Sequence, residues 1–137
     1  MDFELLRLLS DTGLFILIWI VQLVIYPSFY YYSEDQLKKW HEIYKLKISI
    51  IVLPLMLSQL ILHAYAIYGE TSVLNTLMLI MIVFVWLSTF LISVPLHDKI
   101  ENVANTHTYR KRLVNTNWIR TALWSIILII SYINYAK

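Results

Sequence analysis

Charged and amide side chains inside apolar runs are the residues of this sequence best suited to chemistry. Arg120 lies about 10 Å into the last apolar run, which begins near Leu113. Asn117 precedes it by three residues and therefore shares its helix face. If Arg120 faces the interior of a helical bundle, its guanidinium can stabilise an enolate or phenolate oxygen, which the amide would orient. The alternative is an arginine that extends back to the membrane surface.

Two histidines supply candidate bases at a similar level. His97 follows Pro95 at the predicted end of the third helix, and His41 lies in the basic start of the second, near Tyr44. A neutral imidazole accepts a proton near physiological pH. We therefore predict His97, His41, Arg120 and Asn117 as catalytic residues, in a constellation that also includes Tyr30. Solvated histidines at the membrane surface are the competing interpretation.

Aromatic side chains gather at the same level. Those that we predict to contact a bound ligand are Tyr26, Tyr30, Tyr44 and Trp118. An aromatic belt is the alternative, because tyrosine and tryptophan favour the membrane surface in most membrane proteins.

A second polar set lies deeper in the apolar runs. Gln22 and Gln59 are predicted to fasten two helices through a shared hydrogen bond. His63 lies near the opposite surface, about 33 Å along the helix from His41. Apart from these residues, the half of the bundle away from Arg120 is predicted to be dry.

The composition and the motifs exclude several chemistries. The absence of cysteine rules out disulfides, thiolate metal sites and thiol catalysis. No metal site is predicted, because there is no His-Glu-x-x-His motif and Glu42, Glu70 and Glu101 are expected outside the hydrocarbon. No cofactor is predicted, although a haem held by His41 and His97 stays a low-ranked alternative. Nucleic-acid binding has no support, and transport would need more intramembrane charge than one arginine.

Four apolar runs must position these residues. Each has the roughly 20 residues that a helix needs to cross a bilayer, and none has the polar face of a soluble bundle helix. Of the 137 residues, 59% are hydrophobic and 15% charged, a balance typical of membrane proteins. We predict one all-α domain over residues 1–137, an up-down-up-down membrane bundle of two hairpins. Its helices are expected at about 5–32, 35–68, 72–97 and 108–135.

The basic residues predict an orientation. They are concentrated in the two connections near residues 38–47 and 99–112, which the positive-inside bias places in the cytoplasm, with both termini outside. The acidic start does not resemble a signal peptide, so the first helix is expected to be retained. We expect a bacterial inner membrane protein whose partner is the lipid bilayer, and a homo-oligomer is left open. Pro27 and Pro95, each near a cytoplasmic turn, suggest a weak internal repeat.

A longer pattern links the third and fourth helices. Val94-Pro95-Leu96-His97 is followed by Asn115-Thr116-Asn117-Trp118-Ile119-Arg120-Thr121. This pattern resembles the anthrone-oxygenase-like family of small four-helix membrane proteins, which has a Val-Pro-Leu-Asn type sequence and a Trp-Asn-His-x-Arg-Thr type sequence there. Tyr26-Pro27-Ser28-Phe29 and residues 41–56 also match in position. The resemblance implies oxidation of anthrone-type polyketides without a cofactor, by proton abstraction and direct reaction with oxygen.

Two positions depart from the family pattern. His97 stands where the family has asparagine, and Trp118 stands where it has histidine, so His97 would have to replace the missing base. The leading hypothesis is a cytoplasm-facing pocket for a flat lipophilic molecule, in an anthrone-oxygenase-like enzyme. The alternative is a non-enzymatic membrane component, either a binder of lipid, quinone or haem or an accessory subunit.

Overall fold

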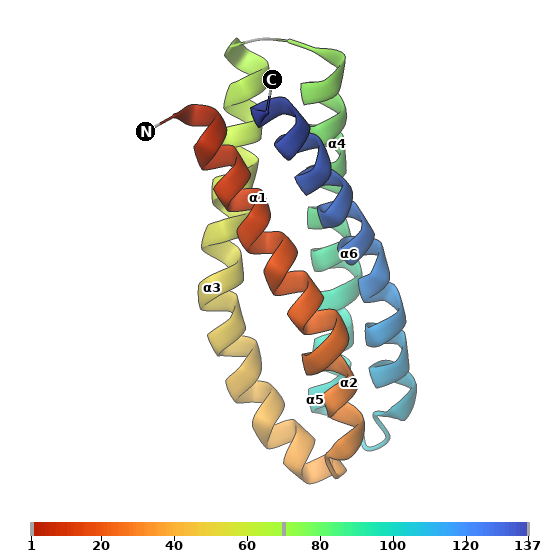
Figure 1. The fold of residues 1–137 in the computed structure, drawn as a ribbon. Coiled ribbons are helices and arrows are strands. Elements are labelled where there is room, and N and C mark those ends of the chain that lie inside the picture. Colours follow the sequence, from red (N-terminus) through yellow and green to blue (C-terminus); the bar gives the residue numbers. More distant parts are fainter. Residues whose placement is uncertain (1, 70, 137) are drawn as a thin grey trace.

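Four long helical spans pack side by side along the whole molecule (Figure 1). The computed structural model describes residues 2–69 and 71–136, so Glu70 lies outside the described residues. The spans are Phe3–Tyr31, Glu34–Gly69, Val73–Asn102 and His107–Tyr135. All four are long and apolar enough to cross a membrane. The predicted all-α, four-helix membrane bundle is confirmed.

Two of the spans are built from several helical segments. The first contains α1 (Phe3–Ile20), the π-helical turn η1 (Val21–Ile25), α2 (Tyr26–Ser28) and the 3-10 turn η2 (Phe29–Tyr31). The third contains α4 (Val73–Ser88), the π-helical turn η3 (Thr89–Ser93) and α5 (Val94–Asn102). The second and fourth spans are the single helices α3 (Glu34–Gly69) and α6 (His107–Tyr135).

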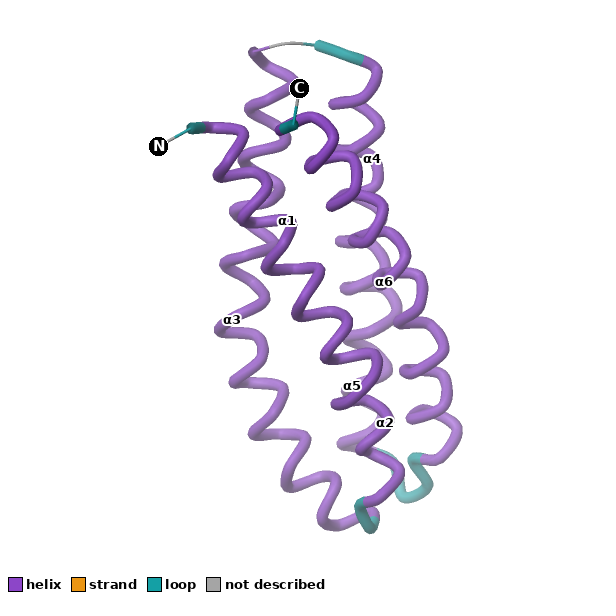
Figure 2. The backbone as a smooth tube through the Cα atoms, viewed as in Figure 1, coloured by secondary structure: helices purple, strands orange, loops and turns teal. Residues whose placement is uncertain are grey.

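The bundle has two distinct ends, as Figure 2 shows. Both chain ends and the connection from α3 to α4 lie at one end, here called the terminal end. The turn before α3 and the loop between α5 and α6 lie at the other, here called the basic end. Because α1 packs against α3 and α6, and α4 packs against the same two helices, the spans enclose a common interior.

Each segmented span carries a π-helical turn just before a proline. Proline lacks an N–H and its ring clashes with the carbonyl four residues earlier, so it disturbs a regular α-helix. The wider turn relieves this conflict: the Tyr26 N–H bonds to the Val21 carbonyl, and the Val94 N–H bonds to the Thr89 carbonyl. The two helical hairpins therefore share a π-helical turn as well as the proline that follows it.

The third span ends later than the sequence predicts. The sequence predicts that this helix ends at His97, two residues after Pro95, but α5 continues to Asn102. The π-helical turn accommodates the proline, so the helix need not stop there. His97 consequently lies within a helix, one turn before Glu101.

Apolar side chains cover the outside of the spans. The large exposed ones include Leu23, Leu46, Ile50, Leu91 and Ile129. A surface of this kind needs lipid around it, since soluble proteins rarely expose such large continuous apolar areas. The chain is therefore an integral membrane protein.

Candidate functional site

Four side chains near the basic end form a continuous hydrogen-bonded relay. The Tyr26 hydroxyl lies 3.0 Å from His97 Nε2. His97 Nδ1 lies 2.6 Å from His41 Nε2, and His41 Nδ1 lies 2.8 Å from Glu101 Oε1. The relay thus connects α2, α3 and α5.

The two ends of the relay fix the direction of its hydrogen bonds. Arg120 donates to the Tyr26 oxygen at 3.2 Å, and arginine can only donate. At the other end an ionised Glu101 can only accept. The consistent arrangement has Tyr26 O–H donating to His97, His97 Nδ1–H donating to His41, and His41 Nδ1–H donating to Glu101. Both histidines are then neutral, and one concerted shift would carry the Tyr26 proton to Glu101.

Helix geometry accounts for the placement of the relay. His97 and Glu101 are four residues apart on α5 and share one face. His41 lies opposite them on α3, fully buried, with its ring edge-on to Phe29 at 5.7 Å between centroids. Packing therefore holds both imidazoles in fixed orientations.

The outer end of the relay meets water through a lysine. Lys45 Nζ lies 2.7 Å from Glu101 Oε2 and 3.4 Å from Asp98 Oδ1. The Lys45 and Asp98 side chains are partly exposed, whereas the Glu101 side chain is only 16% exposed. A proton that reaches Glu101 can thus pass to solvent.

Arg120 faces the bundle interior, which removes the alternative that it extends to the surface. It is 7% exposed and donates to the Tyr26 hydroxyl and to the Asn117 side-chain oxygen Oδ1. The Asn117 amide in turn donates to Gln22 Oε1 at 2.8 Å. Since Asn117 is fully buried and uses both amide ends, it positions Arg120.

The charge on Arg120 is not balanced by a neighbouring carboxylate. Three arginines are buried among the described residues: Arg7, Arg110 and Arg120. Arg7 pairs with Glu4 at 3.0 Å and Arg110 with Glu34 at 3.1 Å. Among the described residues, no carboxylate lies within ion-pair distance of Arg120. Its Nε is also buried without a hydrogen-bond partner. An unpaired cation in a low-dielectric interior is costly and would favour an anionic partner.

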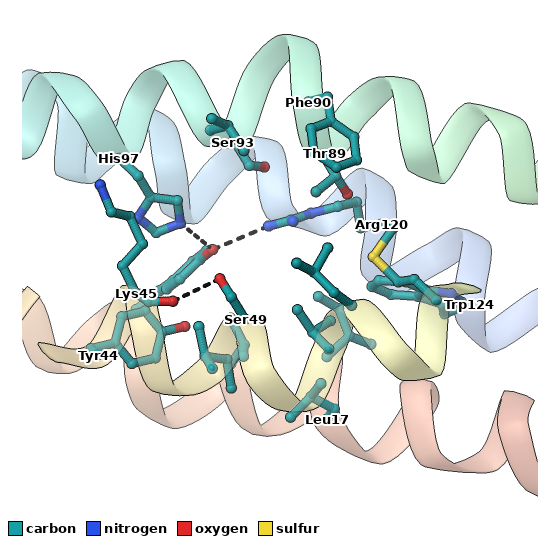
Figure 3. Close-up of a pocket in the computed structure, with 18 residues that line it drawn as sticks. Leu17, Tyr44, Lys45, Ser49, Thr89, Phe90, Ser93, His97, Arg120 and Trp124 are labelled. Atoms are coloured by element: carbon teal, nitrogen blue, oxygen red, sulfur yellow. Dashed lines mark hydrogen bonds between the residues drawn. The ribbon is translucent and has the colours of Figure 1, made fainter. Parts of the chain in front are cut away.

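A cavity of about 160 Å³ adjoins these groups (Figure 3). Its polar wall contains Tyr26, Tyr44, Lys45, His97 and Arg120, and the remainder of its lining is mainly apolar. In Figure 3, dashed lines join the labelled His97 and Arg120 to one oxygen between them. The hydrogen bonds of these two residues identify that oxygen as the Tyr26 hydroxyl.

The most exposed apolar residues of the cavity lining belong to the second and third spans. Leu53 on α3, with Phe90 on η3 and Val94 on α5, line the cavity and are each about two-fifths exposed. Because these apolar side chains belong to the surface that lipid covers, we infer an opening toward the bilayer. A lipophilic molecule could enter there without crossing water.

The haem alternative does not fit this geometry. All four ring nitrogens of His41 and His97 are engaged in the relay, so none is free to bind iron. The two imidazoles also contact each other directly, which leaves no space for a porphyrin between them. No group of three or more acidic or histidine side chains within residues 2–69 and 71–136 is arranged to hold a metal ion.

The terminal half of the bundle is not dry, contrary to the prediction. Asp11 is fully buried there and accepts hydrogen bonds from Gln59 at 2.6 Å, from His63 at 3.1 Å and from the Ser131 hydroxyl. On its other side, His63 Nδ1 accepts from Arg7 at 3.3 Å. The sequence does not reveal this burial, because Asp11 precedes the first apolar run, where a charged residue is ordinarily exposed.

The predicted Gln22–Gln59 hydrogen bond is also wrong. Gln22 bonds to Asn117 and Val114, whereas Gln59 accepts from Trp124 at 3.1 Å and donates to Asp11. Measured from the basic end of each span, Gln22 lies about 14 Å along and Gln59 about 38 Å along. The two amides are therefore at different depths.

The predicted site residues fall into three groups. Tyr26, Tyr44, His97 and Arg120 line the cavity. His41 and Asn117 lie behind that wall and bond to His97 and Arg120, respectively. Two residues lie elsewhere: Tyr30 is exposed beside His107, and Trp118 is half exposed against Trp19. The expected constellation thus assembles without Tyr30.

Four charged residues take part in the relay or in the hydrogen bonds around Asp11 but were not predicted as site residues. They are Arg7, Asp11, Lys45 and Glu101. One usable signal was helical spacing, because Glu101 follows His97 by four residues and Asp11 follows Arg7 by four residues.

Comparison with protein-family models, curated proteins and solved structures finds no match to this chain. The class of protein therefore rests on the fold and the site: a four-span integral membrane protein with a buried cation beside a small cavity.

Proposed function

We propose that this protein binds a small lipophilic molecule with an anionic or ionisable oxygen, and exchanges a proton with it. The observation that carries the proposal is Arg120, a buried guanidinium that lines the cavity and has no carboxylate partner in the part of the chain that the structure describes. Such a group favours a ligand oxygen that is negative or becomes negative during a reaction.

The relay supplies the proton chemistry. A ligand oxygen beside Arg120 and Tyr26 can give its proton to Tyr26 while the Tyr26 proton moves to His97. The shift continues through His41 to Glu101, which accepts the proton and becomes neutral. Before the shift, Lys45 holds the ionised Glu101 in place by its hydrogen bond. A phenol or an enolisable ketone is the class of molecule that this arrangement suits.

Cavity size limits the part of the ligand that is enclosed. A cavity of about 150 Å³ in another protein holds one benzene ring, and the cavity here is about 160 Å³. We therefore propose that one ring enters and that the remainder projects between the second and third spans into lipid.

The family resemblance suggests a finer version of this function. In it, Arg120 stabilises the enolate that forms when the carbon opposite the anthrone carbonyl gives a proton to Tyr26, whose own proton moves to His97. The enolate reacts with molecular oxygen, and loss of water from the resulting hydroperoxide gives the anthraquinone. A three-ring substrate would have to extend beyond the cavity mouth.

Ligand binding is tested with para-octylphenol, using the full chain in lipid nanodiscs and titration calorimetry. We expect Arg120→Gln to weaken binding by at least about tenfold, because a charged hydrogen bond is lost. Arg112→Gln, an exposed position on the same helix, is the matched control and should bind as the wild type does. Equal affinity for para-octylanisole, which has no ionisable oxygen, would contradict the proposal.

The oxygenase version is tested by oxygen uptake with anthrone. Uptake above the uncatalysed rate that is lost in His97→Gln supports it. If the protein binds para-octylphenol but anthrone causes no such uptake, the binding function is supported and the oxygenase function is rejected.

One observation favours a non-enzymatic function. Asn117 joins Gln22 on the first span to Arg120 on the fourth, as expected for residues that only fasten helices. That alternative predicts no saturable binding of para-octylphenol. It also predicts that Arg120→Leu unfolds at a lower temperature than the wild type, because the hydrogen bonds from Arg120 to Asn117 and Tyr26 that fasten the helices are lost.

A further inference from the structure

Two hydrogen-bonded networks reach the same cavity from opposite ends of the bundle. The network at the basic end finishes at Arg120, and the network around Asp11 finishes at Trp124, whose indole N–H donates to Gln59. Arg120 and Trp124 are four residues apart on α6, and both line the cavity. About one helical turn therefore separates the two networks.

Each network also reaches the surface of the molecule. At the terminal end, Arg7 and Glu4 line a surface depression, and the Glu4 side chain is 40% exposed. At the basic end, the Lys45 side chain is 39% exposed. Ionisable groups connected in this way inside a membrane protein are characteristic of proton pathways.

We propose that the bundle conducts protons between its two ends, through Asp11, the cavity and the Tyr26–Glu101 relay. This function does not depend on which molecule occupies the cavity. It also answers the sequence-based objection that the bundle has only one intramembrane charge, because Arg7, Asp11 and His63 are buried as well.

The terminal half of the path operates through His63. Arg7 can only donate, so His63 accepts at Nδ1 and carries its proton on Nε2, which donates to Asp11. Arginine does not release its own proton, so Arg7 must move aside for water from the surface depression to protonate Nδ1. The protonated ring then releases the Nε2 proton to the Asp11 carboxylate. Glu4 offsets the Arg7 charge at the mouth of this half.

The basic half operates through the relay already described. Tyr26 takes a proton from the cavity as its own proton moves to His97, then through His41 to Glu101. Arg120 faces the cavity side of Tyr26, while Lys45 and Asp98 are the charged groups at the outer end.

Gln59 and Trp124 form the constriction between the two halves. The amide and the indole donate hydrogen bonds toward Asp11 but do not release protons under ordinary conditions. Passage therefore requires the Trp124 side chain to move. A smaller residue at this position should admit water and increase the proton flux.

The test measures proton entry into liposomes that contain the purified full chain, with a trapped pH-sensitive dye and a potassium diffusion potential. We expect Trp124→Ala to conduct faster than the wild type, and the double variant Trp124→Ala/Asp11→Asn to return to the flux of protein-free liposomes. Two matched controls should leave flux unchanged: Trp118→Ala, an exposed tryptophan on the same helix, and Asp35→Asn, an exposed carboxylate.

Two results would overturn the proposal. One is a double variant that conducts as fast as Trp124→Ala, because the flux would then bypass Asp11. The other is a Trp124→Ala flux no greater than that of protein-free liposomes. If variants at Asp11 do not fold, as judged by circular dichroism, Trp124→Ala/His97→Gln provides the same comparison for the basic half.

Discussion

Arg120 shows how the environment of one side chain determines what a site can do. Its helix position alone allows either a solvated cation or a buried one. Burial beside Tyr26 and Asn117 makes it a fixed hydrogen-bond donor toward an oxygen in the cavity. A preorganised donor of this kind stabilises charge without reorganising at the moment of reaction.

Tyr26 is the residue through which Arg120 and the histidines act together. Tyr26→Phe removes one hydroxyl and leaves the ring packing with Phe29 in place. We expect affinity for para-octylphenol to fall about twofold to tenfold, the range for one lost hydrogen bond. Titration calorimetry measures this change.

A tyrosine four residues away serves as the control for Tyr26. Tyr30→Phe makes the same chemical change outside the cavity, where the side chain is exposed. It should leave the affinity for para-octylphenol unchanged. If the two variants weaken binding equally, the relay does not contribute to binding.

At the scale of elements, the helices at the basic end are joined by Arg110, which does not line the cavity. Arg110 on α6 donates to the backbone carbonyls of Phe29 at 2.8 Å and Tyr32 at 3.2 Å, where the first span ends. It also donates to Thr106 and pairs with Glu34 at the start of α3. One side chain thereby joins three spans.

Loss of this junction should destabilise the whole bundle. Arg110→Ala leaves buried carbonyl groups without donors, so we expect the free energy of unfolding to fall by about 2 kcal/mol. Arg112→Ala, an exposed neighbour, should change it by less than about 0.5 kcal/mol. Chemical denaturation in detergent micelles, followed by circular dichroism, compares the two variants.

The π-helical turns determine how the first and third spans continue past their prolines. Each lies two residues before a proline, so the helix passes that proline without ending. Continuation of the third span past Pro95 is what places His97 and Glu101 on one face, within reach of His41.

At the scale of the whole molecule, the bundle has a cavity between two polar ends and an apolar exterior. The structure places the chain ends and the basic connections at opposite ends. Which end faces the cytoplasm stays a prediction from the distribution of basic residues.

The absence of cysteine allows a direct test of this orientation. Thr71→Cys lies in the connection between α3 and α4, and Ala104→Cys lies in the loop between α5 and α6; both positions are exposed. In intact cells whose outer membrane has been made permeable, a membrane-impermeant maleimide should label only Thr71→Cys. After the cells are lysed, both variants should react. Labelling of Ala104→Cys alone in intact cells would reverse the predicted orientation.

The sequence by itself determined the four spans and the depth of Arg120. Span length and apolarity are local properties, because a helix must satisfy its own backbone in lipid and rises about 1.5 Å per residue. The start of α3 is also a local property, since the Ser33 hydroxyl accepts a hydrogen bond from the Gln36 N–H three residues later, as in a capping box.

Only the tertiary structure decided which polar groups meet. Contact between His41 and His97 depends on the rotation of two helices and on a π-helical turn that the sequence pattern did not reveal. The partners of Asp11 come from α3 and α6, far along the chain. Depth follows from counting residues, but a hydrogen bond also requires that two helix faces turn toward each other, and packing across the bundle sets that rotation.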